Sequence, residues 1–224
     1  MSSERLSSQF INLQSNENHQ TPRHKKPLRK LGPLLAIALV AGMVWSPASA
    51  SCARVKIEIS ATVSLVDDPD NLLHNTVAPG DIITGIYTYD SFAVDSNPLP
   101  QVGDYYYRAA PNGIRLKVNG LTFATDPTDV NFLLELVNNY QDSDNYVIIS
   151  YNNFFSVSAT GMSVMNIIDW QLDDPTQTAL SSTALPRNAP ILSNWQSIVG
   201  LSISSDGDNH FLIRADVTSA VRRR

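Results

Sequence analysis

Several acidic residues lie in short polar stretches that could supply oxygen ligands to a hard cation. In the stretch Asp206-Gly207-Asp208-Asn209, two carboxylates stand one residue apart and Asn209 adds a neutral oxygen. Gly207 lets the backbone turn tightly there. Calcium takes roughly six to eight oxygen ligands, so backbone carbonyls, water or a second acidic loop such as residues 67–71 would have to contribute. The sequence names calcium, bound by Asp206, Asp208 and Asn209, as the candidate cofactor. The alternative is that Asp and Asn occupy turns for backbone reasons.

Side chains suited to nucleophilic catalysis are scarce. Beyond residue 50 the histidines are His74 and His210, both in turn-like stretches, and no Gly-x-Ser-x-Gly elbow is present. The spacing of His and Cys does not match a zinc site. Glycoside hydrolysis needs only two carboxylates, which Glu58 and Glu135 could supply, although both fall on solvent-facing strand positions. We therefore expect no catalytic residues and no enzyme.

Aromatic residues offer a second kind of chemistry, because flat rings can stack on sugar rings. All eight tyrosines follow residue 50. Neighbouring residues of a strand point to opposite faces, so the triplet at 105–107 must expose at least one ring. The candidate carbohydrate platform consists of Tyr105, Tyr106, Tyr107, Trp170 and Trp195. The alternative is that these side chains serve the core.

The elements that must position these residues are short strands. Alternation of apolar and polar residues, together with β-branched and aromatic runs, predicts strands at 55–65, 82–89, from 105 onward, 114–118, 121–123, 132–137, 146–151, 164–172, 198–203 and 211–217. Asn119-Gly120 between two alternating runs predicts a tight hairpin, because both turn residues must take positive φ. Residues 138–145 are expected to form a hairpin loop.

No convincing long helix follows residue 50, so crossover connections for a parallel sheet are missing. We expect an all-β fold, an antiparallel two-sheet β-sandwich of jelly-roll type, as a single domain over residues 51–221. A basic tail, residues 222–224, follows it. Residues 173–194 form one long connection, which is expected to cover one end of the domain rather than to bind a ligand.

Residues 1–50 have the features of an export leader. A basic region precedes an uncharged stretch at 31–53, whose apolar part is 31–45, and Ala48-Ser49-Ala50 fits a signal-peptidase site. We expect a secretory signal peptide with an apolar helix, cleaved between Ala50 and Ser51. The alternatives are an uncleaved signal anchor and a lipoprotein carrying an acyl group on Cys52. In each case we expect the domain to lie outside the cytoplasm. It is secreted if the leader is cleaved, and it is anchored to the membrane by residues 31–53 if the leader is retained.

Charge narrows the classes of partner. Residues 1–50 hold six of the 16 basic and two of the 21 acidic residues, which leaves ten basic against nineteen acidic residues beyond them. An acidic surface repels phosphate backbones, so no nucleic-acid partner is expected. Contact with a membrane is expected only through an uncleaved leader. The expected partners are an extracellular polysaccharide or a protein of the envelope or matrix.

Several stretches resemble a domain of secreted bacterial proteins that often carry a PEP-CTERM sorting tail. They include Gly85-Ile86-Tyr87-Thr88-Tyr89-Asp90, Val102-Gly103-Asp104-Tyr105, Trp170-Gln171-Leu172-Asp173-Asp174-Pro175 and Trp195-Gln196-Ser197, and the likeness spans roughly residues 55–220. The resemblance implies export and association with a surface or matrix, and it carries over no catalytic residue. Members end in a Pro-Glu-Pro motif, an apolar helix and a basic tail. This chain ends in Val221 and three arginines, either as a tail-less member or as a truncated one.

These observations together predict an exported, non-enzymatic structural or binding module of the bacterial cell envelope or extracellular matrix. The first alternative is a carbohydrate-binding module, and the second is a sugar-active enzyme. A fold does not determine a function, so the choice depends on the site.

Overall fold

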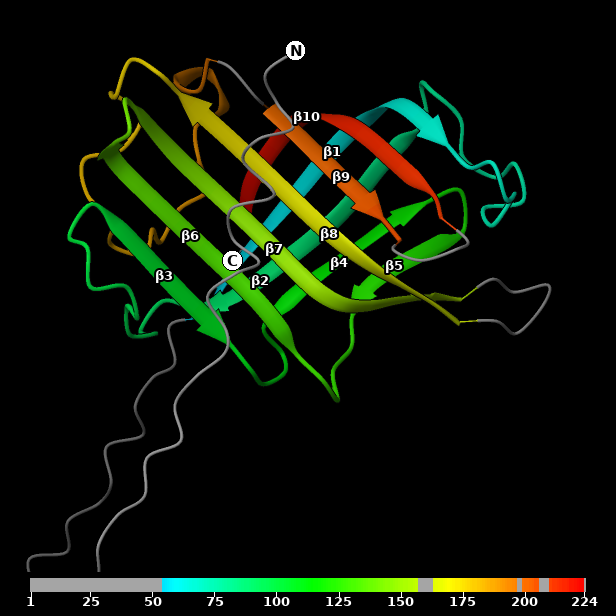
Figure 1. Ribbon diagram of the computed structural model, residues 1–224, viewed down its shortest axis with the longest axis horizontal. Helices are drawn as coiled ribbons and strands as arrows, with labels where there is room; N and C mark the ends of the chain where they lie inside the picture. Colours follow the sequence, from blue (N-terminus) through cyan, green and yellow to red (C-terminus); the bar gives the residue numbers. More distant parts are fainter. Residues whose placement is uncertain (1–53, 157–162, 197–198, 206–209, 224) are drawn as a thin grey trace, which may run out of the picture. The chain divides into compact units, whose positions relative to one another are not determined.

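The computed structural model describes residues 54–156, 163–196, 199–205 and 210–223 (Figure 1). These residues form ten strands: β1 (Arg54–Asp67), β2 (Ile82–Asp90), β3 (Val102–Tyr107), β4 (Gly113–Val118), β5 (Leu121–Thr125), β6 (Asn131–Tyr140), β7 (Ser143–Ser156), β8 (Ser163–Asp174), β9 (Val199–Ser204) and β10 (Leu212–Arg223). A short 3₁₀ turn, η2 (Leu192–Asn194), is the helical element of this part of the chain. Within the described ranges, no helix is long and apolar enough to cross a membrane.

The strands overlap the predicted ranges, but the tyrosine triplet at 105–107 ends β3 and does not begin a strand as predicted. The predicted hairpin between β4 and β5 is confirmed. Asn119 and Gly120 have φ angles of 45° and 87°, as a two-residue hairpin turn requires. The turn between β6 and β7 is tighter than the predicted loop at 138–145. It narrows to Gln141 and Asp142, both with positive φ.

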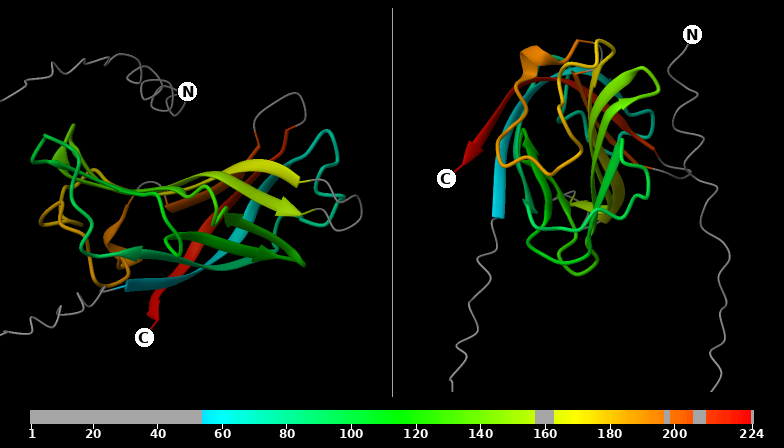
Figure 2. Two further views of the ribbon diagram at one scale, coloured as in Figure 1. Left: turned by 90° about the horizontal axis from the view of Figure 1, so that it is seen from below. Right: turned by 90° about the vertical axis from the view of Figure 1, so that its left-hand side faces the viewer.

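The predicted two-sheet sandwich is wrong, because the strands close into a barrel. Eight antiparallel strands follow one another in the order β7-β5-β4-β2-β1-β10-β9-β8, and pairing between β7 and β8 closes the ring. A sandwich leaves two edges on each sheet, whereas closure removes the edges of these eight strands. Figure 2 shows the two walls of the barrel from the side and from one end.

Closure depends on the fourteen-residue strand β7, which changes partner along its length. Its first part pairs with β6, and its last part pairs with β5 through Phe123 and Phe155. A bulge between Ser150 and Asn153 marks the change, and Asn152 has a φ of 56° there. The Asn153 amide donates to the backbone carbonyls of Ser150 and Asn166. These bonds satisfy polar groups that the bulge would otherwise leave buried without partners.

Beyond β7, the sheet continues through β6 to β3, so the strand order at this end is β3-β6-β7. The inward residues of β3 and β6 join the same core as the barrel strands. For example, the Tyr107 ring of β3 lies 6.5 Å from the Tyr89 ring of β2 and 5.8 Å from the Phe132 ring of β6. These two strands therefore extend one wall of the barrel.

Aromatic side chains fill the interior. The ring centroids of Tyr87 and Trp170 are 5.6 Å apart, and those of Tyr146 and Trp170 are 5.8 Å apart. All three side chains are fully buried. Burial of such rings removes large apolar areas from water and dominates the energetics of a core of this kind.

The long connection between β8 and β9 covers one end of this interior, as expected. Partly buried apolar side chains along it, namely Ala179, Leu180, Leu185, Ala189 and Leu192, pack against the core. The Tyr89 hydroxyl donates to the Pro186 carbonyl at 2.6 Å, and the Gln196 amide donates to the Asp173 carbonyl at 2.9 Å. We call residues 175–196 the covering segment.

Candidate binding surface

Four of the five aromatic residues expected to form a carbohydrate platform lie in the core instead. Tyr105, Tyr107, Trp170 and Trp195 are buried, whereas Tyr106 exposes 46% of its surface. The alternation of a strand explains the triplet, since Tyr105 and Tyr107 point inward and Tyr106 points outward. These five residues therefore do not form a platform on the surface.

The hydroxyl groups of the buried tyrosines serve structure. The Tyr105 hydroxyl donates to the Thr183 carbonyl of the covering segment at 2.8 Å, and the Tyr107 hydroxyl donates to the Asp90 carbonyl at 2.9 Å. A buried hydroxyl without a partner would cost free energy, so each bond fixes a ring and a loop together.

The other expected site residues lie outside the described part of the chain. These are the candidate calcium ligands Asp206, Asp208 and Asn209 and the predicted cleavage site at Ala50 and Ser51. Among the described residues, no group of three or more His, Cys, Asp or Glu side chains could hold a metal ion. One hydrogen bond involves residues 67–71, the second acidic loop considered as a source of calcium ligands. Asp70 accepts a hydrogen bond from the backbone amide of His210 at 3.1 Å, so the loop at 67–71 meets the chain just after residue 209.

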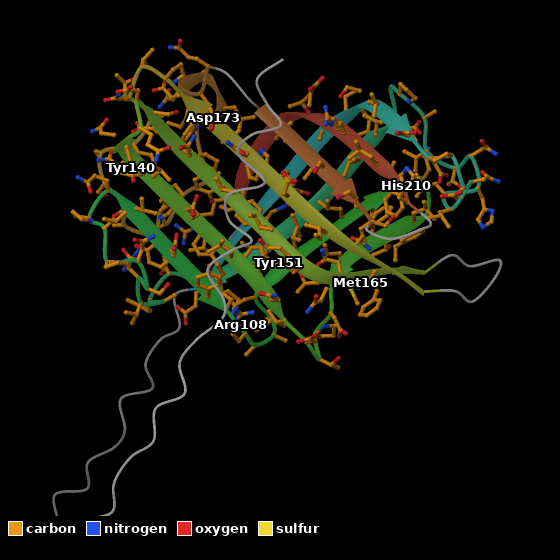
Figure 3. All side chains as sticks on the ribbon, in the orientation of Figure 1. Arg108, Tyr140, Tyr151, Met165, Asp173 and His210 are labelled. Atoms are coloured by element: carbon orange, nitrogen blue, oxygen red, sulfur yellow. The ribbon has the colours of Figure 1, made fainter. Side chains whose placement is uncertain are left out.

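A different set of polar residues comes together on the outer face of β3, β6, β7 and β8. We call Asp104, Tyr106, Glu135, Tyr151 and Asp169 the outer-face cluster. Each of them alternates along its strand with residues of the core. Figure 3 labels Tyr151 near the centre of this face, with Arg108 below it. The cluster thus combines three carboxyl groups with two phenol rings on one wall of the barrel.

Asp104 and Glu135 stand directly opposite each other on β3 and β6. Burial, the charge of the neighbouring Asp104 and a side-chain hydrogen bond with Asp104 together raise the pKa of Glu135 to about 7, and burial is the largest of these causes. The Asp104 Oδ2 atom accepts a hydrogen bond from the Asn97 side-chain amide at 2.9 Å, while Oδ1 is buried without a hydrogen-bond partner. Two ionised carboxylates opposite each other on a sheet are unfavourable, and the raised pKa of Glu135 relieves that repulsion below neutral pH.

Tyr151 and Asp169 of the cluster also have raised pKa values. The pKa of the Tyr151 phenol is raised by burial and then by Tyr106, Glu135 and Asp169. Burial also raises the pKa of Asp169, against the opposing effect of a hydrogen bond of 2.7 Å from the Ser202 hydroxyl. Tyr151 is thus within electrostatic reach of Tyr106, Glu135 and Asp169.

Apolar side chains surround the carboxyl groups on this face. Val102, Leu133 and Val137 each expose only 7% of their surface, yet they lie outside the main core. Val102 pairs with Val137, and Leu133 pairs with Tyr106. The carboxyl groups are therefore set in poorly hydrated surroundings, where an opposite charge would interact more strongly than at an open surface.

The opposite wall of the barrel has the ordinary character of a solvated face. On β1, Glu58 accepts a hydrogen bond of 2.6 Å from the Arg223 guanidinium, and both side chains are exposed. Arg115 and Lys117 on β4 are also exposed. Glu58, one of the two carboxylates considered for glycoside hydrolysis, thus belongs to a surface ion pair far from Glu135 in strand order.

Sequence reasoning named Glu135 only as a solvent-facing carboxylate and did not propose Asp104, Tyr151 or Asp169 as site residues. One signal was present in the strand Phe132-Leu133-Leu134-Glu135-Leu136-Val137, which is apolar on both faces except for Glu135. A strand that is apolar on both faces predicts burial on both faces. A single acid in such a strand points to a carboxyl group in apolar surroundings.

Comparison of the chain with models of protein families, with curated proteins and with solved structures gave no match.

Proposed function

We propose that this protein is an exported, non-enzymatic binding or structural module of the bacterial cell envelope or extracellular matrix, of the kind found with PEP-CTERM sorting tails. Its binding surface in this proposal is the outer face of β3, β6, β7 and β8. The export leader and the acidic domain motivate the location and the class of partner.

The observation that carries the proposal is the contrast between the inside and the outside of the barrel. Tightly packed rings such as Tyr87, Tyr146 and Trp170 occupy the interior. The outer-face cluster instead presents partly exposed phenol rings and carboxyl groups within an apolar surface. A surface of this composition suits recognition of a polymer that lies across the strands.

A sugar-active enzyme is the second candidate, and one observation favours it. Glu135 has a pKa of about 7 and stands beside Asp104, and a carboxyl group of raised pKa next to another carboxyl is the arrangement of a general acid in glycoside hydrolysis. Binding remains the favoured function because Asp104 and Glu135 lie on the outer face of the sheet.

The test is an array of matrix and envelope polysaccharides, read for binding and for release of reducing ends. Binding by the wild-type protein that is lost on changing Tyr106→Ala would support a carbohydrate-binding module. Turnover of any glycan would replace the proposal with the enzyme. If no polysaccharide binds, capture of envelope proteins by the wild-type protein but not by Tyr106→Ala would leave a protein partner as the function.

A further inference from the structure

We propose that the outer-face cluster binds a polysaccharide that carries free amino groups, such as a polymer of glucosamine, by receiving a ligand ammonium group beside Asp104 and Glu135. This inference rests on the proposed function and names the class of ligand for the same face. It follows from three features of the cluster. These are negative charge without a paired cation, aromatic rings, and an outer edge of β3 whose backbone groups are already hydrogen-bonded.

The carboxyl pair lacks a cation. In the described ranges, neither Asp104 nor Glu135 forms an ion pair, and Asp104 Oδ1 is buried without a hydrogen-bond donor. Two ionised carboxylates directly opposite each other destabilise a sheet, and the charge of Asp104 accordingly adds to the raised pKa of Glu135. An ammonium group beside Glu135 would compensate that repulsion, would favour the ionised pair and would donate charge-assisted hydrogen bonds to it.

The charged groups around the pair do not fill this role. On β7 and β8, Tyr151 and Asp169 add a neutral phenol and a third acid. Arg108, which follows β3, lies with its guanidinium 5.3 Å from the centroid of the Tyr106 ring and donates to the Asn131 side chain. Arg214 of β10 acts on Asp169 at the far side of the cluster. The face therefore keeps a negative excess, which complements a cationic ligand.

The surroundings favour a sugar over a peptide. Peptides commonly bind to a sheet by adding a strand along its free edge. At the outer edge of β3, the backbone amide of Asp104 already donates to the Asp95 carboxylate at 3.0 Å, and its carbonyl accepts from the Ser96 amide at 3.0 Å. The edge is thus occupied, whereas the Tyr106 ring on the face remains partly exposed for contact with the flat side of a sugar ring.

A bound metal ion is a poorer match than an ammonium group. Calcium needs roughly six to eight oxygen ligands, and the described residues hold no suitable group of three or more metal-binding side chains. An ammonium group requires fewer acceptors and is also attracted to the face of an aromatic ring. Tyr106, which pairs with Leu133, and Tyr151, which pairs with Asn131, provide such rings on the strands that flank β6.

Titration calorimetry on the full chain at pH 7 tests the inference with three ligands of similar length. These are a glucosamine hexamer, an N-acetylglucosamine hexamer as the uncharged sugar, and hexalysine as the cation without sugar rings. We expect the glucosamine hexamer to bind at least about tenfold more tightly than either of the others, a factor worth about 1.4 kcal/mol.

Variants locate the ligand. Glu135→Gln and Asp104→Asn should each weaken binding of the glucosamine hexamer about tenfold or more, whereas Glu58→Gln on the opposite wall should leave it unchanged. A cation held beside Glu135 also favours its ionised form, so binding near pH 6.5 should release protons from that group. Calorimetry in buffers of different ionisation enthalpy measures that release, and Glu135→Gln should remove its contribution. Unfolding midpoints of all variants exclude a loss of fold.

The outcomes separate the inference from the proposed function. Equal binding of the two sugar hexamers, unaffected by Glu135→Gln, would overturn the inference and leave a polysaccharide-binding module. Tighter binding of hexalysine would overturn the sugar and identify a basic protein segment as the ligand. Absence of binding to all three would overturn the inference, while the wider array described above would still decide the proposed function.

Discussion

Asp144 and Asp174 lie directly opposite each other on β7 and β8, and both carboxylates are completely buried. Asp144 accepts hydrogen bonds from the backbone amides of Asn139 and Leu180, both at 2.8 Å. Asp174 accepts hydrogen bonds from the side chains and backbone amides of Thr176 and Thr178. The two acids thus fasten the covering segment to the end of the barrel.

Removal of the Asp144 carboxylate should loosen that attachment. Asp144→Ala leaves two backbone amides without acceptors in a buried site, and hydrogen bonds to charged groups contribute about 1.5–3 kcal/mol each. We expect a loss of roughly 3 kcal/mol in the free energy of urea unfolding. The matched control is Asp142→Asn, at an exposed turn position in the same hairpin, which should change stability by less than about 0.5 kcal/mol. A similar loss in both variants would contradict this account.

The lowered pKa of Asp174 predicts that the stability of the folded protein falls at acidic pH. Hydrogen bonds from Thr176 and Thr178 hold the pKa of this carboxyl below its usual range. Its stabilising contribution is therefore present above the pKa of the unfolded chain, about 3.9, and is lost as the pH falls through the lower folded-state value. Unfolding midpoints measured from pH 5 down to pH 2 should fall less steeply for Asp174→Asn than for the wild type. Parallel curves would show that this carboxylate has no part in acid unfolding.

The hydroxyl oxygens of Tyr87 and Tyr146 are 2.9 Å apart, and both side chains are fully buried. Tyr87→Phe or Tyr146→Phe alone should cost about 1–3 kcal/mol, because the remaining hydroxyl loses its partner in the core. The double variant should be within about 1 kcal/mol of the wild type, because it leaves neither hydroxyl unpaired. A double-mutant cycle by chemical denaturation measures this coupling. Additive losses would show that each hydroxyl has another partner.

The strands could be predicted from the sequence, but their closure into a barrel could not. Alternation along residues 55–65 shows that β1 buries one face, and this holds equally for a sandwich and a barrel. The difference lies in the pairing of β7 with both β5 and β8 around the bulge at Asn152, which depends on residues distant in sequence. The sequence marks this bulge only by the polar pair Asn152-Asn153, and asparagine is equally common in turns.

The candidate surface was predictable only in part, for a related reason. Tyr106 could be identified as an outward ring because a strand triplet must expose one residue. The meeting of Asp104 with Glu135 follows from the register between β3 and β6, which joins residues about thirty positions apart. No local pattern fixes such a register. Trp170 and Trp195 were placed on the surface because composition does not distinguish a core ring from an exposed one.

The proposed export predicts the mass of the mature protein. We expect cleavage between Ala50 and Ser51 and release outside the cytoplasmic membrane. Cell fractionation followed by intact mass measurement checks this expectation. A membrane-bound species of full-length mass would identify an uncleaved anchor at residues 31–53, and an added acyl mass on Cys52 would identify a lipoprotein.

Calcium binding remains a proposal for Asp206, Asp208 and Asn209, and the contact between Asp70 and His210 brings a second acidic loop toward that turn. A ligand that binds only the folded protein stabilises it by about 2.7 kcal/mol at a hundredfold excess over its dissociation constant. Melting curves in millimolar calcium and in chelator should therefore differ for the wild type. They should coincide after Asp206 and Asp208 are both changed to Asn, and should move closer together in Asp70→Asn. Coincident wild-type curves would contradict calcium binding.

Glu135 predicts that the domain loses stability as the pH rises toward neutrality. Burial and Asp104 raise its pKa to about 7 in the folded protein, against about 4.3 in an unfolded chain. Protonated Glu135 is therefore favoured by the folded state, and its contribution is fully present below about pH 4.3 and lost as the pH rises through 7. At about 1.36 kcal/mol per pKa unit, the upper limit of this loss is about 3.7 kcal/mol.

Urea unfolding of the wild type and of Glu135→Gln between pH 4.5 and pH 8 measures this contribution. The amide is neutral throughout, so the variant should be the more stable protein at pH 8 and should lose that advantage toward pH 4.5. Glu58→Gln controls for the removal of one carboxylate, since Glu58 is an exposed partner of Arg223 and should leave the pH profile unchanged. A Glu135→Gln profile parallel to that of the wild type would show that the Glu135 carboxyl titrates as it does in the unfolded chain.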